Sequence, residues 1–439
     1  MSPTTQGLLV FVVTIGLLFS GVPVAFGLGA ISIVFLLLFQ GFDALRVVAE
    51  TFWSGLDEFT LVSIPMFVMM GAAIGSSPAG KDLYEALDRW LYRVPGGLAI
   101  SNIGACAIFA ALTGSSPACC AAIGKMGIPE MRRRGYPDDV ACGSICAGGT
   151  LGILIPPSIT FILYGIATET SIGRLFLAGV MPGLLLTGLF IAWTLFIIWK
   201  RGFRTHAPEF RYSWKEKFAS VPKVFPFIAI IVGVMYVLYG GVATPSEGAG
   251  VGAALCVLAA VVIYRMWAPS MWWEILRDTM RESVMILMII AAAVLFGYML
   301  TSLYLTQTLA TAIAELHVNR WVLMGIINVF LLVCGFFIPP AAIILMTSPI
   351  LMPIITAAGF DPVWFGVILT INMEVGLIHP PVGLNIYIVQ SIAPDVPVTT
   401  VMWGSVPYVL CMFLCIVILC IFPEIATWLP DTLMGPVHK

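Results

Sequence analysis

The chain has 439 residues, of which 60% are hydrophobic and only 10% are charged; the net charge is −2 and the mean hydropathy is +1.03. A soluble domain carries about 25% charged residues, so this composition excludes a soluble protein and indicates an all-α polytopic membrane protein. No basic block suits nucleic acid, and the ten cysteines lie in apolar segments without metal-ligand spacing.

The first half of the chain contains several apolar stretches of membrane-spanning character. Full crossings are predicted near residues 7–20, 24–40, 61–76, 139–166 and 175–199. The first is expected to be a retained crossing and not a signal peptide, because it lacks a basic start. The segment 97–124 is also apolar, but ALTGSSPACC at its centre predicts a turn at Gly114 to Pro117. Each arm is then only about 12–14 residues long, so a re-entrant hairpin is expected.

The second half repeats this order after a polar linker over 201–222. Full crossings are predicted near residues 224–240, 248–264, 283–302, 363–388 and 401–422, with a second hairpin over 321–352. The tip of that hairpin is FFIPPAA, Phe336 to Ala342. Two amphipathic segments, 42–59 and 266–282, precede the third crossing of each half and are expected to lie in the membrane surface.

A separation of 224 residues relates the two halves. It pairs Pro129 with Pro353, Gly135 with Gly359, Gly152 with Gly376, Pro156 with Pro380 and Pro157 with Pro381. Glycine and proline dictate backbone shape, so these pairs predict two structural repeats, over 1–200 and 223–422, followed by a tail over 423–439. Each repeat has five crossings plus one hairpin. Because five is an odd number, the second repeat is expected to be inverted in the membrane.

The distribution of basic residues predicts the orientation. With the N-terminus outside, 17 of the 21 Lys and Arg residues fall inside, and only Arg46, Arg174, Arg320 and Lys439 fall outside. Both termini are then periplasmic. The first hairpin opens to the cytoplasm and the second to the periplasm, with Arg132 to Arg134 as a cytoplasmic anchor.

Two proline pairs predict the position of a binding site. GTLGILIPPSI (149–159) and EVGLIHPPVGLN (374–385) each break an apolar helix at membrane depth. Paired broken helices in inverted repeats are typical of secondary transporters, whose site lies at the midplane. Free carbonyls and hydroxyls suit Na⁺, and half-helix N-termini suit a carboxylate. The hairpin tips near Ser115–Ser116 and Pro339–Pro340 are expected to converge with the two breaks.

Polar side chains around the second break are further candidates. Glu374 either tunes a cation site, contacts the substrate or is a structural carboxyl. His379 either donates to a substrate carboxylate, senses pH or is a histidine satisfied at the helix break. Asn372 and Asn385 bracket the break, and for them a structural role is favoured.

These residues resemble a known family. The tip GSSPA, the break GTLGILIPPSI, the GYP triplet after the basic loop, and INMEVGLIHPPVGLN look like the large membrane subunit of tripartite ATP-independent periplasmic (TRAP) transporters. The likeness covers nearly the whole chain. It implies an elevator-type ion-transporter fold, with a scaffold over 1–95 and 223–320 and a mobile transport part over 96–200 and 321–422.

The resemblance also implies the activity and the partners. Family members take up organic acid anions, such as C4-dicarboxylates or sugar acids, with Na⁺ coupling across the bacterial inner membrane. They work with a small four-helix membrane subunit and a periplasmic substrate-binding protein.

The resemblance implies candidate ligands. The first Na⁺ site would use Ser115, Ser116, Gly152, Leu154 and Pro156, and the second Pro340, Gly376, Ile378 and Pro380. The substrate would meet Ser115, Ser116, Pro157, Ser158, Pro340, Glu374, His379, Pro381 and Asn385. The chain departs from the family in two places: many members carry an aspartate in the second tip and a threonine where His379 stands.

Two alternatives remain open. A stand-alone divalent-anion/Na⁺ symporter of the same superfamily would need no periplasmic protein. A polytopic membrane enzyme is more remote, since only His379 of the four histidines lies at membrane depth and neither HExxH nor GxSxG occurs. No GxxxxGK[ST] loop occurs either, so uptake without ATP hydrolysis is expected.

Overall fold

The fold is all-helical throughout the part of the chain that the structure describes. A computed structural model describes residues 3–94, 96–202, 212–240, 242–308, 311, 318–380 and 383–435. Among these, six helices are long and apolar enough to cross a membrane, or eight if each of two bent helix pairs forms one crossing. The polytopic membrane protein predicted from composition is thus confirmed.

The first part of the chain has helices at the predicted crossings 7–20, 24–40 and 61–76, but those over the first two have only 17 residues each and do not count among the six. Its elements are α1 (Pro3–Phe19), α2 (Val24–Gln40), η1 (Phe42–Leu45), α3 (Arg46–Leu56), η2 (Phe59–Val62), α4 (Ser63–Gly75) and α5 (Ala79–Leu91). A bend of 57° separates the Phe42–Leu56 segment from the segment that contains α4. The amphipathic helix α5 was not anticipated from the sequence.

The two hairpins are α6 (Gly97–Thr113) with α7 (Ser116–Arg133), and α15 (Arg320–Gly335) with α16 (Pro340–Ala357). The arms of the first hairpin have 17 and 18 residues, so the length predicted for them was too short, and those of the second have 16 and 18. α6 is helical over the whole of Gly97–Thr113, and α7 continues through Pro129 into the basic loop, beyond the end of the apolar sequence. By length and hydropathy α16 alone would pass as a crossing.

The broken helices follow the hairpins. The first consists of α8 (Asp138–Leu154) and α9 (Ile159–Thr168), bent by 40°, and the second of α17 (Pro362–Ile378) and α18 (Leu384–Ile392). The last helices are α10 (Ile172–Lys200), α19 (Val398–Ile421) and α20 (Glu424–Met434). The bounds of α7 and α16 differ by 224 residues at both ends, as do those of α8 and α17. This matches the separation of the proline and glycine pairs.

The middle of the chain corrects two predicted boundaries. Its helices are α11 (Trp214–Tyr239), α12 (Pro245–Val262) and α13 (Pro269–Ser302). α11 starts inside the predicted linker because Ser213 and Glu216 form a capping box. The predicted surface segment 266–282 and the crossing 283–302 form one continuous 34-residue helix from Pro269, whereas α3 ends at Leu56 before a bend.

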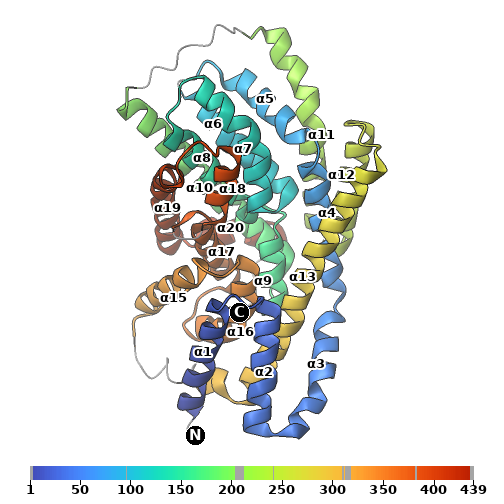
Figure 1. Cartoon of the computed structure of the whole chain (residues 1–439), viewed down its shortest axis with the longest axis vertical. Coiled ribbons are helices and arrows are strands. Elements are labelled where there is room, and N and C mark those ends of the chain that lie inside the picture. Colours follow the sequence, from blue (N-terminus) through green and yellow to red (C-terminus); the bar gives the residue numbers. More distant parts are fainter. Residues whose placement is uncertain are drawn as a thin grey trace.

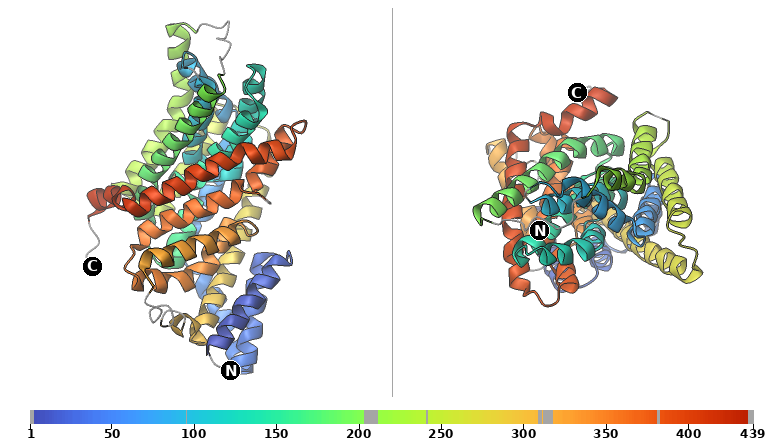
Figure 2. Two further views of the ribbon diagram at one scale, coloured as in Figure 1. Left: turned by 90° about the vertical axis from the view of Figure 1, so that its left-hand side faces the viewer. Right: turned by 90° about the horizontal axis from the view of Figure 1, so that it is seen from above.

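The helices gather into two groups (Figure 1). In one, α13 packs against α2, α3 and α4, while α12 packs against α4 and α11. In the other, α8 packs against α6, α7, α17 and α19, with α10 beside α19. Figure 2 shows α19 crossing obliquely over this second group. The amphipathic α5 touches both groups, since it packs against α11 as well as α6 and α7.

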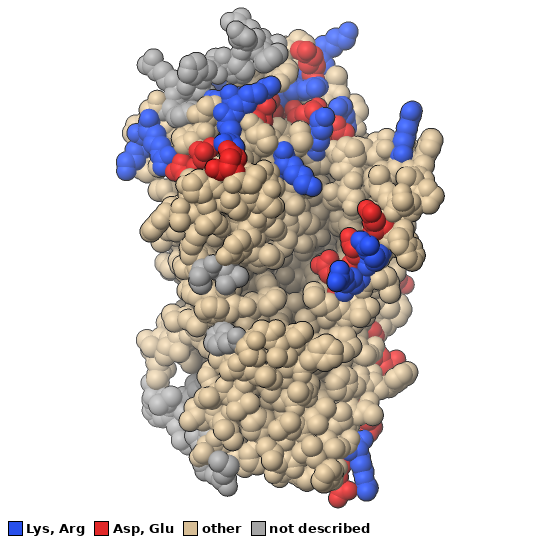
Figure 3. Space-filling view, viewed as in Figure 1, with Lys and Arg blue, Asp and Glu red and all other residues tan. Residues whose placement is uncertain are grey.

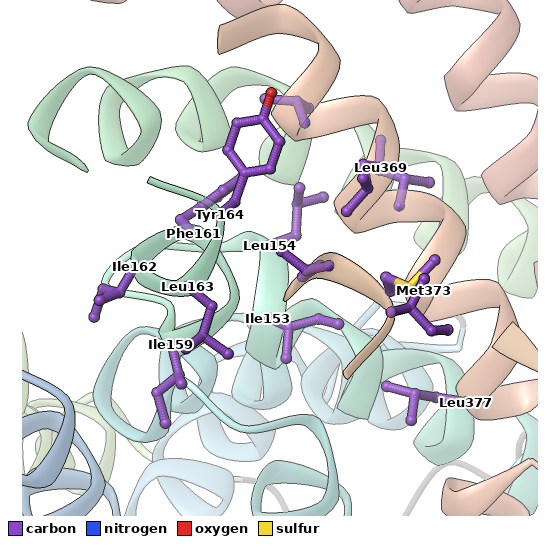
Figure 4. Packing of buried hydrophobic residues seen from close by; sticks show 14 of the residues in the cluster. Ile153, Leu154, Ile159, Phe161, Ile162, Leu163, Tyr164, Leu369, Met373 and Leu377 are labelled. Atoms are coloured by element: carbon purple, nitrogen blue, oxygen red, sulfur yellow. The ribbon is translucent and has the colours of Figure 1, made fainter. Parts of the chain in front are cut away.

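The core of the second group lies around the first helix break. Leu154 and Phe161 flank the break, and both are fully buried. Leu369 and Met373 of α17 face them in Figure 4. The backbone of the break is therefore enclosed by apolar protein, which is where irregular backbone is tolerated at membrane depth.

Candidate functional site

The first hairpin tip and the first helix break lie in direct backbone contact. Gly114 has a φ of +57°, a left-handed conformation that favours glycine, and Ser115 is the extended N-cap of α7. A Cβ on Gly152 would lie 2.7 Å from the carbonyl carbon and oxygen of Ser115. A Cβ on Gly114 would lie 3.0 Å from the carbonyl oxygen of Pro157. The absence of side chains at both glycines lets tip and break meet.

The prolines leave carbonyl oxygens of α8 without their helical donors. A helical carbonyl accepts from the N–H four residues ahead, and Pro156 and Pro157 have none. The affected carbonyls belong to Gly152 and Ile153. That of Ile153 accepts the Ser158 hydroxyl at 2.5 Å. The carbonyl of Gly152 lacks its helical donor, and a carbonyl oxygen of this kind suits a hard cation such as Na⁺.

A side chain from the second repeat completes this region. Asn385 of α18 is fully buried, and its Nδ2 donates to Ser116 Oγ at 2.8 Å and to the Cys146 carbonyl at 3.2 Å. Its Oδ1 is buried without a hydrogen-bond partner among the described residues. The structure therefore brings Asn385 to the first tip, whereas the sequence placed it only beside the second break.

The second broken helix contacts the end of α15, about one helical turn before the expected tip residues Pro339 and Pro340. A Cβ on Gly376 would lie 2.3 Å from the carbonyl oxygen of Gly335, the last residue of α15. This tip has four residues, 336–339, whereas the first has only Gly114 and Ser115 between its helices. The candidate Pro340 starts α16, five residues beyond Gly335.

His379 caps the end of α17 and stacks on the second tip. Its ring lies 4.5 Å from that of Phe336, with 19° between the planes, and its Nδ1 contacts the carbonyl oxygen of Pro380. Ile378 is the last residue of α17 and is buried. The candidate Pro381 lies outside the described residues.

Buried polar groups continue along α17. Glu374 is fully buried, and neither of its carboxyl oxygens has a hydrogen-bond partner among the described residues. Asn372 donates to the Asn328 side chain and to the Ile368 carbonyl. Asn328 of α15 was missed in the sequence analysis, although an amide in an apolar hairpin arm is a usable signal for a polar contact.

Two cavities lie beside the hairpins. One, of about 420 Å³, is lined by residues of α4, α5, α7 and α13, including Ser115, Lys81, Lys125 and Glu282. The other, of about 440 Å³, is lined almost wholly by apolar residues of α1, α13, α15 and α16. Figure 3 shows a hollow near the middle of one face, with charged side chains beside it. The sequence analysis had not singled out the two lysines or Glu282 for this site.

Ion pairs hold the end of the molecule that carries most of the charge (Figure 3). Arg134 pairs with Asp88 through both guanidinium Nη atoms, at 2.9 and 2.7 Å, which joins α7 to α5. Arg132 bonds Asp395 and Asp138, and its guanidinium holds the pKa of Asp395 below its usual value. Burial raises the pKa of Tyr136 to about 12.

The described residues contain no group of three or more His, Cys, Asp or Glu side chains that could hold a metal ion. The ten cysteines are free thiols, nine of them buried, as expected for hydrophobic core residues.

Comparison with known proteins places these features in a family context. Residues 11–425 match the family model described as "Tripartite ATP-independent periplasmic transporter, DctM component". The C4-dicarboxylate TRAP transporter large permease protein DctM of Pseudomonas aeruginosa is 36% identical over 405 residues, which cover 92% of this chain and 93% of that protein. The sialic acid TRAP transporter large permease protein SiaM of Vibrio cholerae is 32% identical over 421 residues, which cover 96% of this chain and 97% of that protein.

A solved structure resembles the chain in fold. The YdaH transporter of Alcanivorax borkumensis, described as having an unusual topology, aligns with a TM-score of 0.67 and 16% identity. The alignment covers 98% of this chain and all of that one. At this identity the likeness concerns the fold alone.

Proposed function

The chain belongs to the DctM family of tripartite ATP-independent periplasmic transporter components, and we propose that it is the large permease of a Na⁺-coupled uptake system for a small organic acid anion. The observation that carries the proposal is the backbone contact of each hairpin tip with a broken helix, Gly152 against Ser115 and Gly376 against Gly335. The two contacts involve the equivalent glycines of the two broken helices, which is what a site closed from two sides requires.

The chemistry of the first tip supports both ligands. Na⁺ would be held by carbonyl and hydroxyl oxygens of Ser115, Ser116, Gly152, Leu154 and Pro156. The α7 N-terminus at Ser115 and the α9 N-terminus at Ser158 favour a carboxylate. The second Na⁺ site would use Gly376, Ile378 and Pro380, with Gly335 as a nearer tip residue than Pro340.

The substrate class is proposed from the relatives and from the tips. The two relatives described above are named for C4-dicarboxylate and for sialic acid, and both substrates are carboxylates. We propose the same chemical class for this chain. Glu374 and His379 at the second break, and Asn385 at the first tip, would adjust the selectivity between acids.

An elevator movement is proposed from the arrangement of the helices. The scaffold would consist of the group around α4, α12 and α13, and the transport part of the group around α8, α17 and α19. Both cavities lie where the hairpins face α13. Residual space at this boundary is compatible with one group sliding past the other.

The proposed assembly sits in the bacterial inner membrane with both termini periplasmic. It would contain a small membrane subunit and a periplasmic binding protein that delivers the anion, with lipid around the remaining surface. A thermal-shift screen of the cognate binding protein against C4-dicarboxylates and sugar acids would identify the substrate.

Reconstitution in proteoliposomes tests the proposal. We expect the chain alone to give negligible uptake at micromolar substrate, because capture would depend on the binding protein. Adding the small subunit and the loaded binding protein should give Na⁺-driven uptake that saturates with binding-protein concentration. Robust Na⁺-driven uptake by the chain alone would favour the stand-alone symporter, and uptake that requires ATP would contradict the mechanism.

A further inference from the structure

One face of α7 connects the first hairpin tip to a lysine. Ala118, Ala121, Ala122 and Lys125 follow the helical spacing i, i+3, i+4 and i+7, so they share one side of the helix. All four line the 420 Å³ cavity together with Ser115. Lys125 lies about 15 Å along the helix from Ser115, at a rise of about 1.5 Å per residue.

The lining of this cavity carries more positive than negative charge. Lys81 of α5 and Lys125 of α7 are its basic residues, and Glu282 of α13 is its acidic residue among the described lining. No described carboxylate forms an ion pair with Lys125, and the nearest to Lys81 is Glu85 at 3.9 Å. Among the described residues Lys125 is thus without an ion pair and Lys81 has one long one, which leaves positive charge to attract an anion.

Small side chains line the cavity between the tip and Lys125, and the space widens toward Gly75, where a Cβ would meet nothing within 4 Å. Alanine is the smallest residue with a Cβ, and three of them face the cavity from α7. Gly71, Gly75 and Gly80 line the opposite wall, with Ser76 and Ser77 between them as hydroxyl groups. Gly71 and Gly80 hold the walls close together, since a Cβ on Gly71 would lie 2.6 Å from the Thr113 carbonyl oxygen and one on Gly80 3.5 Å from the Ala122 Cβ.

We propose that this cavity is the cytoplasmic release passage for the organic anion, in which Lys125 and Lys81 form a second, weaker carboxylate subsite beyond the tip. The inference rests on the proposed function and adds a location to it. Glu282, on the facing wall, repels the same anion and so limits how long it stays. The subsite contacts the anion only in the cytoplasm-facing state, because Lys125 lies on the predicted cytoplasmic side of the tip.

Two substitutions, which remove charges of opposite sign, test this passage in the complete reconstituted system. Lys125→Gln removes an attractive charge, and Glu282→Gln removes a repulsive one with little change of shape. The readout is the lumenal concentration of unlabelled succinate, or of the acid selected by the binding-protein screen, that halves the initial rate of labelled uptake. The lumen of these proteoliposomes faces the predicted cytoplasmic side.

We expect Lys125→Gln to raise this half-inhibiting concentration about two- to five-fold at low salt, the range of a partly exposed ion pair. Glu282→Gln should lower it by a similar factor. Both effects should shrink at high salt, because exposed charges are screened. The external concentration that half-saturates uptake should change less than the lumenal value in both variants.

Lys215→Gln is the matched control, because Lys215 is an exposed lysine of α11 outside the cavity lining. The inference would be overturned if the half-inhibiting lumenal concentration were unchanged in Lys125→Gln or shifted equally in Lys125→Gln and Lys215→Gln. A rise of this concentration in Glu282→Gln would also overturn it. A complete wild-type system without any uptake would instead defeat the proposed function.

Discussion

Gly152 and Gly376 let the hairpin tips contact the helix breaks, and adding a single methyl group at position 152 tests the first contact. An alanine at position 152 would bring its Cβ to 2.7 Å from the Ser115 carbonyl and 2.9 Å from the Ser116 nitrogen. These atoms are backbone, so the tip itself must shift. We expect Gly152→Ala to reduce Na⁺-driven uptake about tenfold or more and to raise the Na⁺ concentration that half-saturates it, because small misplacements of binding groups are costly.

Gly188→Ala is the control for this substitution. Gly188 also lies inside a helix, α10, but a Cβ there would meet nothing within 4 Å. Both variants gain the same intrinsic helix propensity, so a difference between them reports the contact with the tip. Uptake and Na⁺ dependence in Gly152→Ala equal to those of Gly188→Ala would show that the tip contact has no part in coupling.

The helices of the two hairpins provide equivalent positions for testing the inverted topology. Arg133 ends α7, Ala357 ends α16, and the two residues are separated by 224 positions. Both are exposed. In a background without the native cysteines, Arg133→Cys should react with a membrane-impermeant maleimide from the cytoplasmic side, and Ala357→Cys from the periplasmic side.

The expected sides of labelling depend on one physical rule, the preference of Lys and Arg for the cytoplasmic side. Each variant must retain measurable uptake, so that labelling reports a folded protein. Labelling of both cysteines from the same side would contradict the inverted repeat, although the helices would still match in length.

Across the whole molecule, the proposed scaffold needs a partner surface that stays still while the transport part moves. The amphipathic segments of both halves carry exposed tryptophans: Trp53 on α3 is 73% exposed and Trp273 on α13 is 69% exposed. We expect the small membrane subunit to cover the exposed tryptophans of both segments. Trp53→Cys and Trp273→Cys should then lose most of their labelling by a lipid-soluble maleimide when the small subunit is co-purified, since buried thiols are shielded.

Trp403→Cys serves as the comparison, because Trp403 is 74% exposed but belongs to α19 of the proposed transport part. Its labelling should not change on addition of the small subunit. If protection occurs at Trp403 and not at Trp53 or Trp273, the small subunit binds the transport part and the proposed division into scaffold and transport part is wrong.

The sequence alone determined the membrane class, most helix positions and the repeat spacing. Composition decides whether a chain can be soluble. Proline and glycine act on the conformation of their own backbone, so the effects of Pro156, Gly114 and Gly152 can be predicted from the local sequence. The same local rules located the two tips and the two breaks. They misjudged the hairpin arms and α13, because packing sustains a helix beyond the point where apolar sequence or a predicted boundary ends it.

Only the tertiary structure decided which of these elements meet. Asn385 reaches Ser116 across 269 positions of sequence, Phe336 stacks on His379, and Lys81, Lys125 and Glu282 face one cavity from three different helices. Such contacts depend on how whole helices pack, and no local pattern around Lys125 or Asn385 encodes their partners. Side-chain packing between distant helices, and not local propensity, therefore determines which polar groups share a site.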